Sequence, residues 1–141
     1  PRAQAPKGRK TNGPEMSPSA PRRHKQSRQK AWRFGRFAET LAAWLLRFRG
    51  YRVIQRGFRA AVGEIDIVAR RGGLFVFVEV KARKDRAAAV TPGQTARIVR
   101  AAQAFLQAHP HFSNFDQRFD VILVSPWRLP VHLVDAWRPE L

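Results

Sequence analysis

The chain has 141 residues, of which 44% are hydrophobic, so it is long enough for one compact domain with a substantial core. It contains no cysteine, which excludes disulfides, thiolate zinc sites and cysteine nucleophiles. No apolar run approaches the roughly 20 residues of a membrane span, and we expect a cytoplasmic protein with no membrane partner. The net charge of +17 predicts a polyanionic partner, because each phosphate that a cation neutralises releases condensed counterions.

We expect a disordered basic tail over residues 1–30. This segment holds nine Lys or Arg side chains against one acid, Glu15, and has no periodicity that could bury a core. Two interpretations of the tail stay open: an arm that binds nucleic acid, or an extension that only keeps the protein soluble. Residues 31–141 are expected to form a single α/β domain.

The pattern changes at Ala31, where apolar residues recur at helical spacing until Gly50 ends the run. A strand, a hairpin, a polar loop, a second helix and two further strands follow. The second helix has Thr91 as N-cap and Pro92 at its first position. The order α-β-β-β-α-β-β predicts an α/β fold with a mixed central sheet flanked by helices. The expected ranges are 31–50, 51–58, 62–70, 74–82, 91–109, 118–125 and 131–137.

Charged residues lie in the middle of the predicted hairpin, whose strands are otherwise rich in Ile, Val and Phe. A two-residue turn at Gly72-Gly73 places Asp66 opposite Glu79 and Glu64 opposite Lys81. Side chains two residues apart share a face, so all four project from one side of the hairpin. Like charges placed opposite each other are destabilising. A hard divalent cation bound by Asp66 and Glu79 would offset that cost. The alternative is a solvent-exposed face on which Glu64 and Lys81 form a plain ion pair.

The segments GEIDIVA (63–69) and FVEVKAR (77–83) resemble the signature of the bacterial YraN family of endonuclease-like proteins. That family is similar to the PD-(D/E)xK nuclease superfamily, in which a hairpin presents an Asp and an (Asp/Glu)-x-Lys pair. The resemblance covers nearly all of residues 33–136. It implies a restriction-endonuclease-like core, with Asp66 and the run Glu79-Val80-Lys81 at the positions of the motif.

The resemblance draws attention to Glu39, because such nucleases often supply a further acid from the first helix. Glu39 shares a helical stripe with Gly35, which we expect to allow close packing on the sheet. The alternative is an ion pair between Glu39 and Arg36. Gln94 is similarly ambiguous: Thr91 and Gln94 fit a capping box, whereas related nucleases place a Gln or Lys on this helix to help the site. The family usually has Lys near this position.

Together these features predict an Mg²⁺- or Mn²⁺-dependent endonuclease that hydrolyses phosphodiester bonds of nucleic acid, with DNA, possibly branched, as the expected substrate. Asp66, Glu79 and Glu39 would serve the metal, Lys81 would orient or activate water and stabilise developing charge, and Glu64 and Gln94 would support them. Expected phosphate contacts are Arg83, Lys84, Arg86, Arg97 and Arg100. The alternative is a non-catalytic nucleic-acid-binding protein that retains the nuclease fold.

Two further features of the sequence have more than one interpretation. Asp120 could be catalytic, but it is expected to pair with Arg118 on the same strand face. Aromatic residues next to arginines, as in Trp127-Arg128, could stack on nucleobases or lie at the edges of the core.

Overall fold

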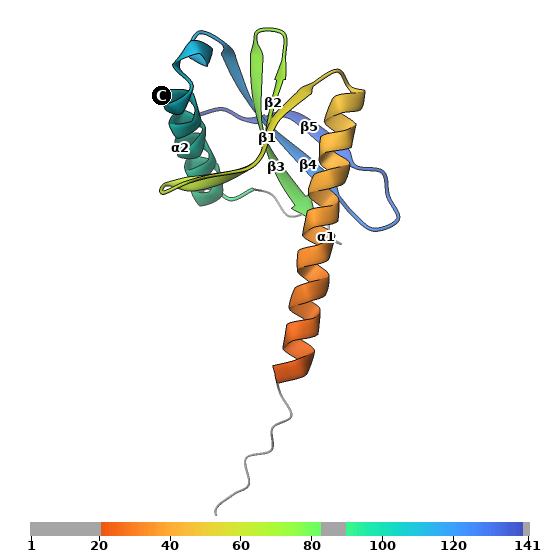
Figure 1. Cartoon of the computed structure of the whole chain (residues 1–141). Coiled ribbons are helices and arrows are strands. Elements are labelled where there is room, and N and C mark those ends of the chain that lie inside the picture. Colours follow the sequence, from red (N-terminus) through yellow and green to blue (C-terminus); the bar gives the residue numbers. More distant parts are fainter. Residues whose placement is uncertain (1–20, 83–89, 140–141) are drawn as a thin grey trace, which may run out of the picture.

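The computed structural model describes residues 21–82 and 90–139, in which two helices and a 3-10 turn accompany a five-stranded sheet (Figure 1). The order of elements is the predicted one and confirms an α/β fold with a mixed sheet. The elements are α1 (Pro21–Phe48), β1 (Arg52–Ala60), β2 (Gly63–Arg71), β3 (Leu74–Ala82), α2 (Pro92–Ala108), η1 (Pro110–Phe112), β4 (Asp116–Val124) and β5 (Val131–Trp137). No helix in these described ranges is long and apolar enough to cross a membrane.

Helix α1 begins at Pro21, ten residues before the expected start at Ala31. Residues 21–30, which the sequence assigned to the tail, are therefore helical, and the first part of the helix extends beyond the sheet (Figure 1). Proline suits the first helical position, and the Arg, Lys and Gln residues that follow it are good helix formers. The rest of the expected tail, residues 1–20, lies outside the described residues, as does the loop 83–89.

The strands follow one another across the sheet in the order β1-β2-β3-β4-β5. Strands β3 and β4 are parallel, and all other neighbours are antiparallel. A parallel pair needs a crossover connection, which α2 supplies. Because β3 and β4 point the same way, their C-terminal ends lie at the same end of the sheet.

A helix covers each face of the sheet. On one face, α1 buries Ala38, Ala42 and Leu46 against alternate residues of the strands, such as Val76 and Val78. The other face is aromatic and packs against α2; this second core contains Phe75, Phe77, Phe105 and Phe119. The alternation of β3 therefore places the odd-numbered residues on the α2 face. Glu79 and Lys81 share this face with Phe75 and Phe77, as the sequence predicted.

The two helices differ in how closely they approach the strands. At Gly63 an added Cβ would lie 2.4 Å from the backbone oxygen of Arg97 in α2, so only glycine fits there. The expectation that Gly35 serves close packing is wrong: among the described residues no atom lies within 4 Å of the Cβ position at Gly35. The tight contact between helix and sheet is thus between α2 and the start of β2.

A buried polar cluster joins β5, and Tyr51 in the segment between α1 and β1, to β4 on the α1 face. Asp120 is fully buried and accepts two hydrogen bonds of 2.8 Å from Arg118, which confirms the predicted pairing. It also accepts hydrogen bonds from His132 Nε2 at 2.6 Å and from the backbone N–H of Asp135 at 2.9 Å. Arg118 donates further to the Tyr51 hydroxyl at 2.6 Å. Every oxygen of this carboxylate is satisfied, which is a structural role.

Replacement of Gly63 with Ala should destabilise the fold by about 1–3 kcal/mol, because β2 must move away from the α2 backbone. Gly35→Ala is the matched control and should instead stabilise α1 by about 0.5–1 kcal/mol, since its Cβ meets no described atom. Urea unfolding of both variants measures the difference. Equal stability of Gly63→Ala and wild type would show that the two backbones are not in contact.

Replacement of Asp120 with Ala should cost about 3–5 kcal/mol, because it leaves Arg118 without its buried partner. Burial alone would raise the pKa of Asp120, but hydrogen bonds from His132 and Arg118 outweigh it and lower the pKa to about 2. The contribution of the carboxylate is therefore complete above about pH 4 and is lost as the pH falls toward 2. Thermal unfolding from pH 2 to 7 tests both points. Asp116→Ala, at an exposed position of β4, should have little effect at any pH.

Candidate active site

The hairpin of β2 and β3 has the predicted register only near its turn. Ile67 pairs with Val78 and Val68 with Phe77, and the ladder continues to the turn at Gly72 and Gly73. On the other side of Ile67 the ladder between β2 and β3 stops, while β2 remains paired with β1 as far as Gly63. The backbone N–H of Val80 donates instead to the Asp66 side chain at 2.8 Å. Asp66 thus occupies the point where the two strands separate.

This separation corrects one expectation about Glu64. The predicted position of Glu64 opposite Lys81 is wrong, because β2 has left β3 before that point. Glu64 lies opposite Arg59 of β1, and the two exposed side chains form an ion pair of 3.4 Å. Glu64 therefore lines the edge of the site and does not hold Lys81.

Asp66 and Glu79 lie side by side, with a hydrogen bond between their carboxyl groups. The side chain of Glu79 is only 18% exposed. Burial raises the pKa of Glu79, and the Asp66 charge and the hydrogen bond to Asp66 raise it further, to about 8, against the opposing effect of Lys81. Burial also raises the pKa of Asp66, although the hydrogen bond from Val80 opposes the shift. At neutral pH the pair therefore shares a proton.

Lys81 lies beside this pair, and its side chain is largely buried. Its Nζ lies 3.5 Å from Glu79 Oε1 and donates to Gln94 Oε1 at 3.3 Å. Gln94 Oε1 also accepts from the Thr91 backbone N–H at 3.1 Å, and the backbone N–H of Gln94 donates to Thr91 Oγ1 at 3.2 Å. The capping box is thus confirmed, and the same side-chain oxygen of Gln94 also contacts Lys81. The capping interpretation of Gln94 is therefore confirmed, and its contact with Lys81 places the first turn of α2 beside the site; a contribution of Gln94 to catalysis stays a prediction.

Glu39 reaches the same region from α1. Its pKa is raised, first by burial and then by the negative charge of Asp66, while Arg56 and Arg36 lower it less. Arg36 therefore acts on Glu39 without dominating it. Glu39 is thus partly buried and within electrostatic range of Asp66, and its role in the site stays a prediction.

An open cleft of about 600 Å³ lies over these groups, between the β1–β2 turn and α2. The residues that line it include the acids Asp66 and Glu79, the amide Gln94, and the basic residues Arg59 and Arg97. Of the predicted phosphate contacts only Arg97 lines this cleft. Arg100 lines a different cavity near Trp137, and the other three, Arg83, Lys84 and Arg86, lie outside the described residues.

Arg59 was missed by the sequence analysis. After a turn at Ala61 and Val62, the segment GEID at the start of β2 runs back along the last residues of β1. This pairing places Arg59 directly opposite Glu64. The predicted strand ended at Phe58, so Arg59 was not considered as part of the site.

The residues of the site suit a hard divalent cation in their chemistry. Asp66 and Glu79 offer adjacent carboxylate oxygens, and a cation between them would replace the proton that they share. Within residues 21–82 and 90–139, no group of three or more Asp, Glu or His side chains is close enough to hold an ion. Two carboxylates therefore form the acidic set, and oxygens of water or substrate would complete a coordination shell.

Among solved structures, the chain is similar to the Holliday junction resolvase of the archaeal hyperthermophile Archaeoglobus fulgidus. The TM-score is 0.51 at 21% sequence identity, over 70% of this chain and 73% of the resolvase. At this identity the similarity shows the fold alone, which agrees with the predicted restriction-endonuclease-like core.

Relatives in sequence are much closer. A protein of Parvibaculum lavamentivorans is 52% identical over 77% of this chain and 84% of its own length, and is named UPF0102 protein. A UPF0102 protein of Bradyrhizobium sp. strain ORS 278 is 48% identical over 92% of this chain and 94% of its own length. The profile described as "Uncharacterised protein family UPF0102" matches residues 38–124, which include Asp66, Glu79 and Lys81. The chain therefore belongs to the UPF0102 family, which is the YraN family that its hairpin signature resembles.

Proposed function

We propose that the protein is a metal-dependent endonuclease that hydrolyses phosphodiester bonds of DNA. One observation carries the proposal: a partly buried pair of carboxyl groups, Asp66 and Glu79, lies beside the ammonium of Lys81 in a cleft that Arg59 and Arg97 also line. Burial of two acids side by side destabilises a fold, so a stability role does not account for them. Pairs of titratable groups with shifted pKa values are typical of active sites.

The nuclease-like fold supports the choice of nucleic acid as substrate. The similar solved structure is described as a Holliday junction resolvase, which makes branched DNA a reasonable substrate to test. The net charge of +17 supports the same partner, because a cationic surface attracts phosphate backbones strongly. The roles of the individual residues are part of the proposal.

Asp66 and Glu79 would hold one or two Mg²⁺ or Mn²⁺ ions, with Glu39 assisting through water. When bound, such an ion supplies a Lewis acid for the phosphoryl oxygen and lowers the pKa of water. The backbone N–H of Val80 donates to Asp66 at 2.8 Å and keeps that carboxylate in place. Without that donor, Asp66 would be free to turn toward solvent.

Lys81 would place a positive charge next to the phosphate in the transition state. The contact with Gln94 holds its Nζ near Glu79, so the ammonium is preorganised before substrate binds. Arg59 and Arg97 would bind the backbone on either side, as would Arg83, Lys84 and Arg86 of the loop that follows β3. Glu64 would keep Arg59 in position through their ion pair.

A second candidate is a protein that binds nucleic acid without cutting it. It is favoured by the small acidic set, since the described residues provide no third carboxylate close enough to enclose an ion. The same cleft and the same cations would serve binding alone. Cleavage assays separate the two candidates.

Asp66→Asn, Glu79→Gln and Lys81→Met should each reduce cleavage at least about a hundredfold while leaving substrate affinity nearly unchanged. These groups act on charge that develops in the transition state, whereas affinity comes from many dispersed cations. The assay compares linear, flapped and four-way branched DNA with Mg²⁺ and with Mn²⁺. Asp116→Asn, an exposed acid at the start of β4, is the control and should cut normally. Wild-type protein that binds all three substrates and cuts none would replace the endonuclease with the binding protein.

Binding of Mn²⁺ should release a proton below about pH 8, because the pKa of Glu79 is raised to about 8 and the ligand must be deprotonated. Apparent affinity should therefore rise with pH and level off above about pH 8. Calorimetry in two buffers of different ionisation enthalpy measures the proton release. Asp66→Asn should abolish binding, and Glu64→Gln should preserve it. Affinity that is independent of pH would show that the shared proton is not at the metal site.

A further inference from the structure

The loop between β4 and β5, residues 125–130, presents a tryptophan in an unusual state. Trp127 is fully exposed, and its backbone has a φ of 63°, in the left-handed region. Bulky side chains rarely adopt this conformation, and large apolar side chains are seldom left entirely in water. Pro126 and Pro130 flank the exposed residues and restrict the conformations of the loop. The loop therefore has a strained backbone at a residue whose ring is in solvent and does not contribute to the core.

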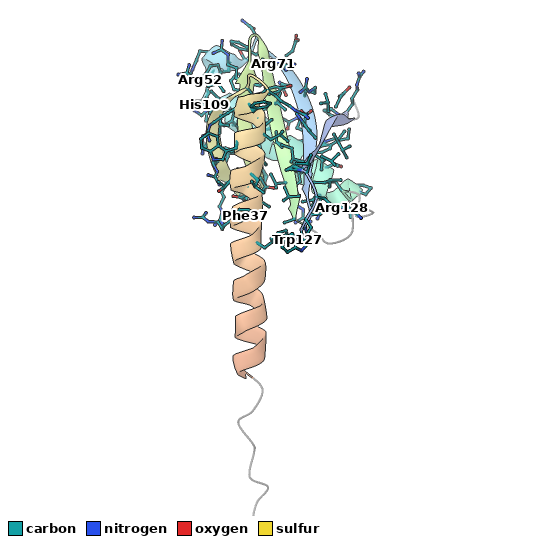
Figure 2. All side chains as sticks on the ribbon, turned by 90° about the vertical axis from the view of Figure 1, so that its right-hand side faces the viewer. Phe37, Arg52, Arg71, His109, Trp127 and Arg128 are labelled. Atoms are coloured by element: carbon teal, nitrogen blue, oxygen red, sulfur yellow. The ribbon has the colours of Figure 1, made fainter. Side chains whose placement is uncertain are left out.

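The register of the parallel strands places this loop at the same end of the sheet as the candidate active site. Lys81 lies opposite Leu123 and Ala82 opposite Val124, and the loop starts at the next residue. Neighbouring strands are about 5 Å apart, and four residues span at most about 14 Å, so Trp127 lies within about 20 Å of Lys81. Figure 2 shows Trp127 and Arg128 at the lower end of the sheet, where β3 ends in Figure 1, and Arg52 and Arg71 at the opposite end.

The side chains of the loop indicate which kind of molecule would bind to it. An exposed indole next to an exposed guanidinium, that of Arg128, combines a stacking surface with a phosphate ligand. In an intact duplex both faces of each base are covered by its neighbours. A protein ring can therefore stack only on a base that is unpaired, as at a flap, a gap or a branch point.

We propose that Trp127 stacks on an unpaired nucleobase of the substrate, with Arg128 on the adjacent phosphate, and that this contact selects branched or partly single-stranded DNA over duplex. The inference rests on the proposed function of the cleft and adds the structure of its substrate. At 3.4 Å per nucleotide, the distance limit places the unpaired base within about six nucleotides of the phosphate in the cleft.

The test measures binding of the full chain in an Asp66→Asn background, with a duplex and with the same duplex carrying a single-stranded flap. Trp127→Ala should weaken flap binding about tenfold and leave duplex binding unchanged. Trp127→Phe should retain most of the preference, because a benzene ring also stacks. Trp44→Ala, at an exposed tryptophan of α1, is the matched control and should not alter the preference.

A second variant guards against an effect on folding. Trp127→Gly should raise the melting temperature, because glycine accepts a φ of 63° without strain, and should nevertheless lose the flap preference. An equal loss on flap and duplex, or no loss on either, would overturn the inference. So would a shift of Trp127 fluorescence with vesicles of anionic phospholipid and none with flap DNA, which would assign the loop to a membrane surface.

Different results would refute the proposed function and the stacking contact. Wild-type protein that cuts no substrate refutes the endonuclease, whereas the flap preference in the Asp66→Asn background does not depend on cutting. Loss of the preference with cleavage intact refutes only the stacking contact.

Discussion

The separation of β2 from β3 beyond Ile67 is the constraint on which the candidate site depends. Where two strands part, backbone N–H groups lose their partners and must find others. Here the Asp66 carboxylate takes the N–H of Val80, which fixes the acid at the base of the gap. The gap itself becomes the cleft, because β2 stays with β1 and curves toward α2. That curvature brings Gly63 against the Arg97 backbone, where no side chain fits.

Two polar clusters of the sheet stabilise opposite protonation states of an acid that is shielded from solvent. Asp120 receives hydrogen bonds from two side chains and a backbone N–H, so its charge is stabilised and its pKa is lowered to about 2. Burial and the neighbouring Asp66 raise the pKa of Glu79 to about 8, against the opposing effect of the Lys81 ammonium at 3.5 Å. The first cluster is complete within the protein and holds β5 to β4. In the second, the single ammonium of Lys81 does not balance two adjacent carboxyl groups, and a bound cation would supply the missing charge.

The end of the sheet that carries the acidic pair also gathers the other features that suit nucleic acid. The start of α2 contributes Gln94 and Arg97, the β1–β2 hairpin contributes Arg59, and the β4–β5 loop presents Trp127. These segments are far apart in sequence and come together because β3 and β4 are parallel and α2 crosses between them. A backbone bound across this end would meet cations in the cleft and an aromatic ring beyond it.

The sequence by itself determined the order of the elements, the hairpin register near Gly72-Gly73, the capping box at Thr91 and the shared face of Glu79 and Lys81. These features follow from periodicity and turn chemistry, which act over a few neighbouring residues. The tertiary structure alone decided that Glu64 pairs with Arg59, that Gln94 contacts Lys81 and that Gly63, not Gly35, is the close contact. It also decided that Trp127 is exposed on a strained loop. The physical reason is that, where the pairing of two strands stops, the next contacts of each strand depend on the twist of the sheet and on helix packing. Those interactions join residues that are distant in the chain, so they cannot be predicted from a local sequence pattern.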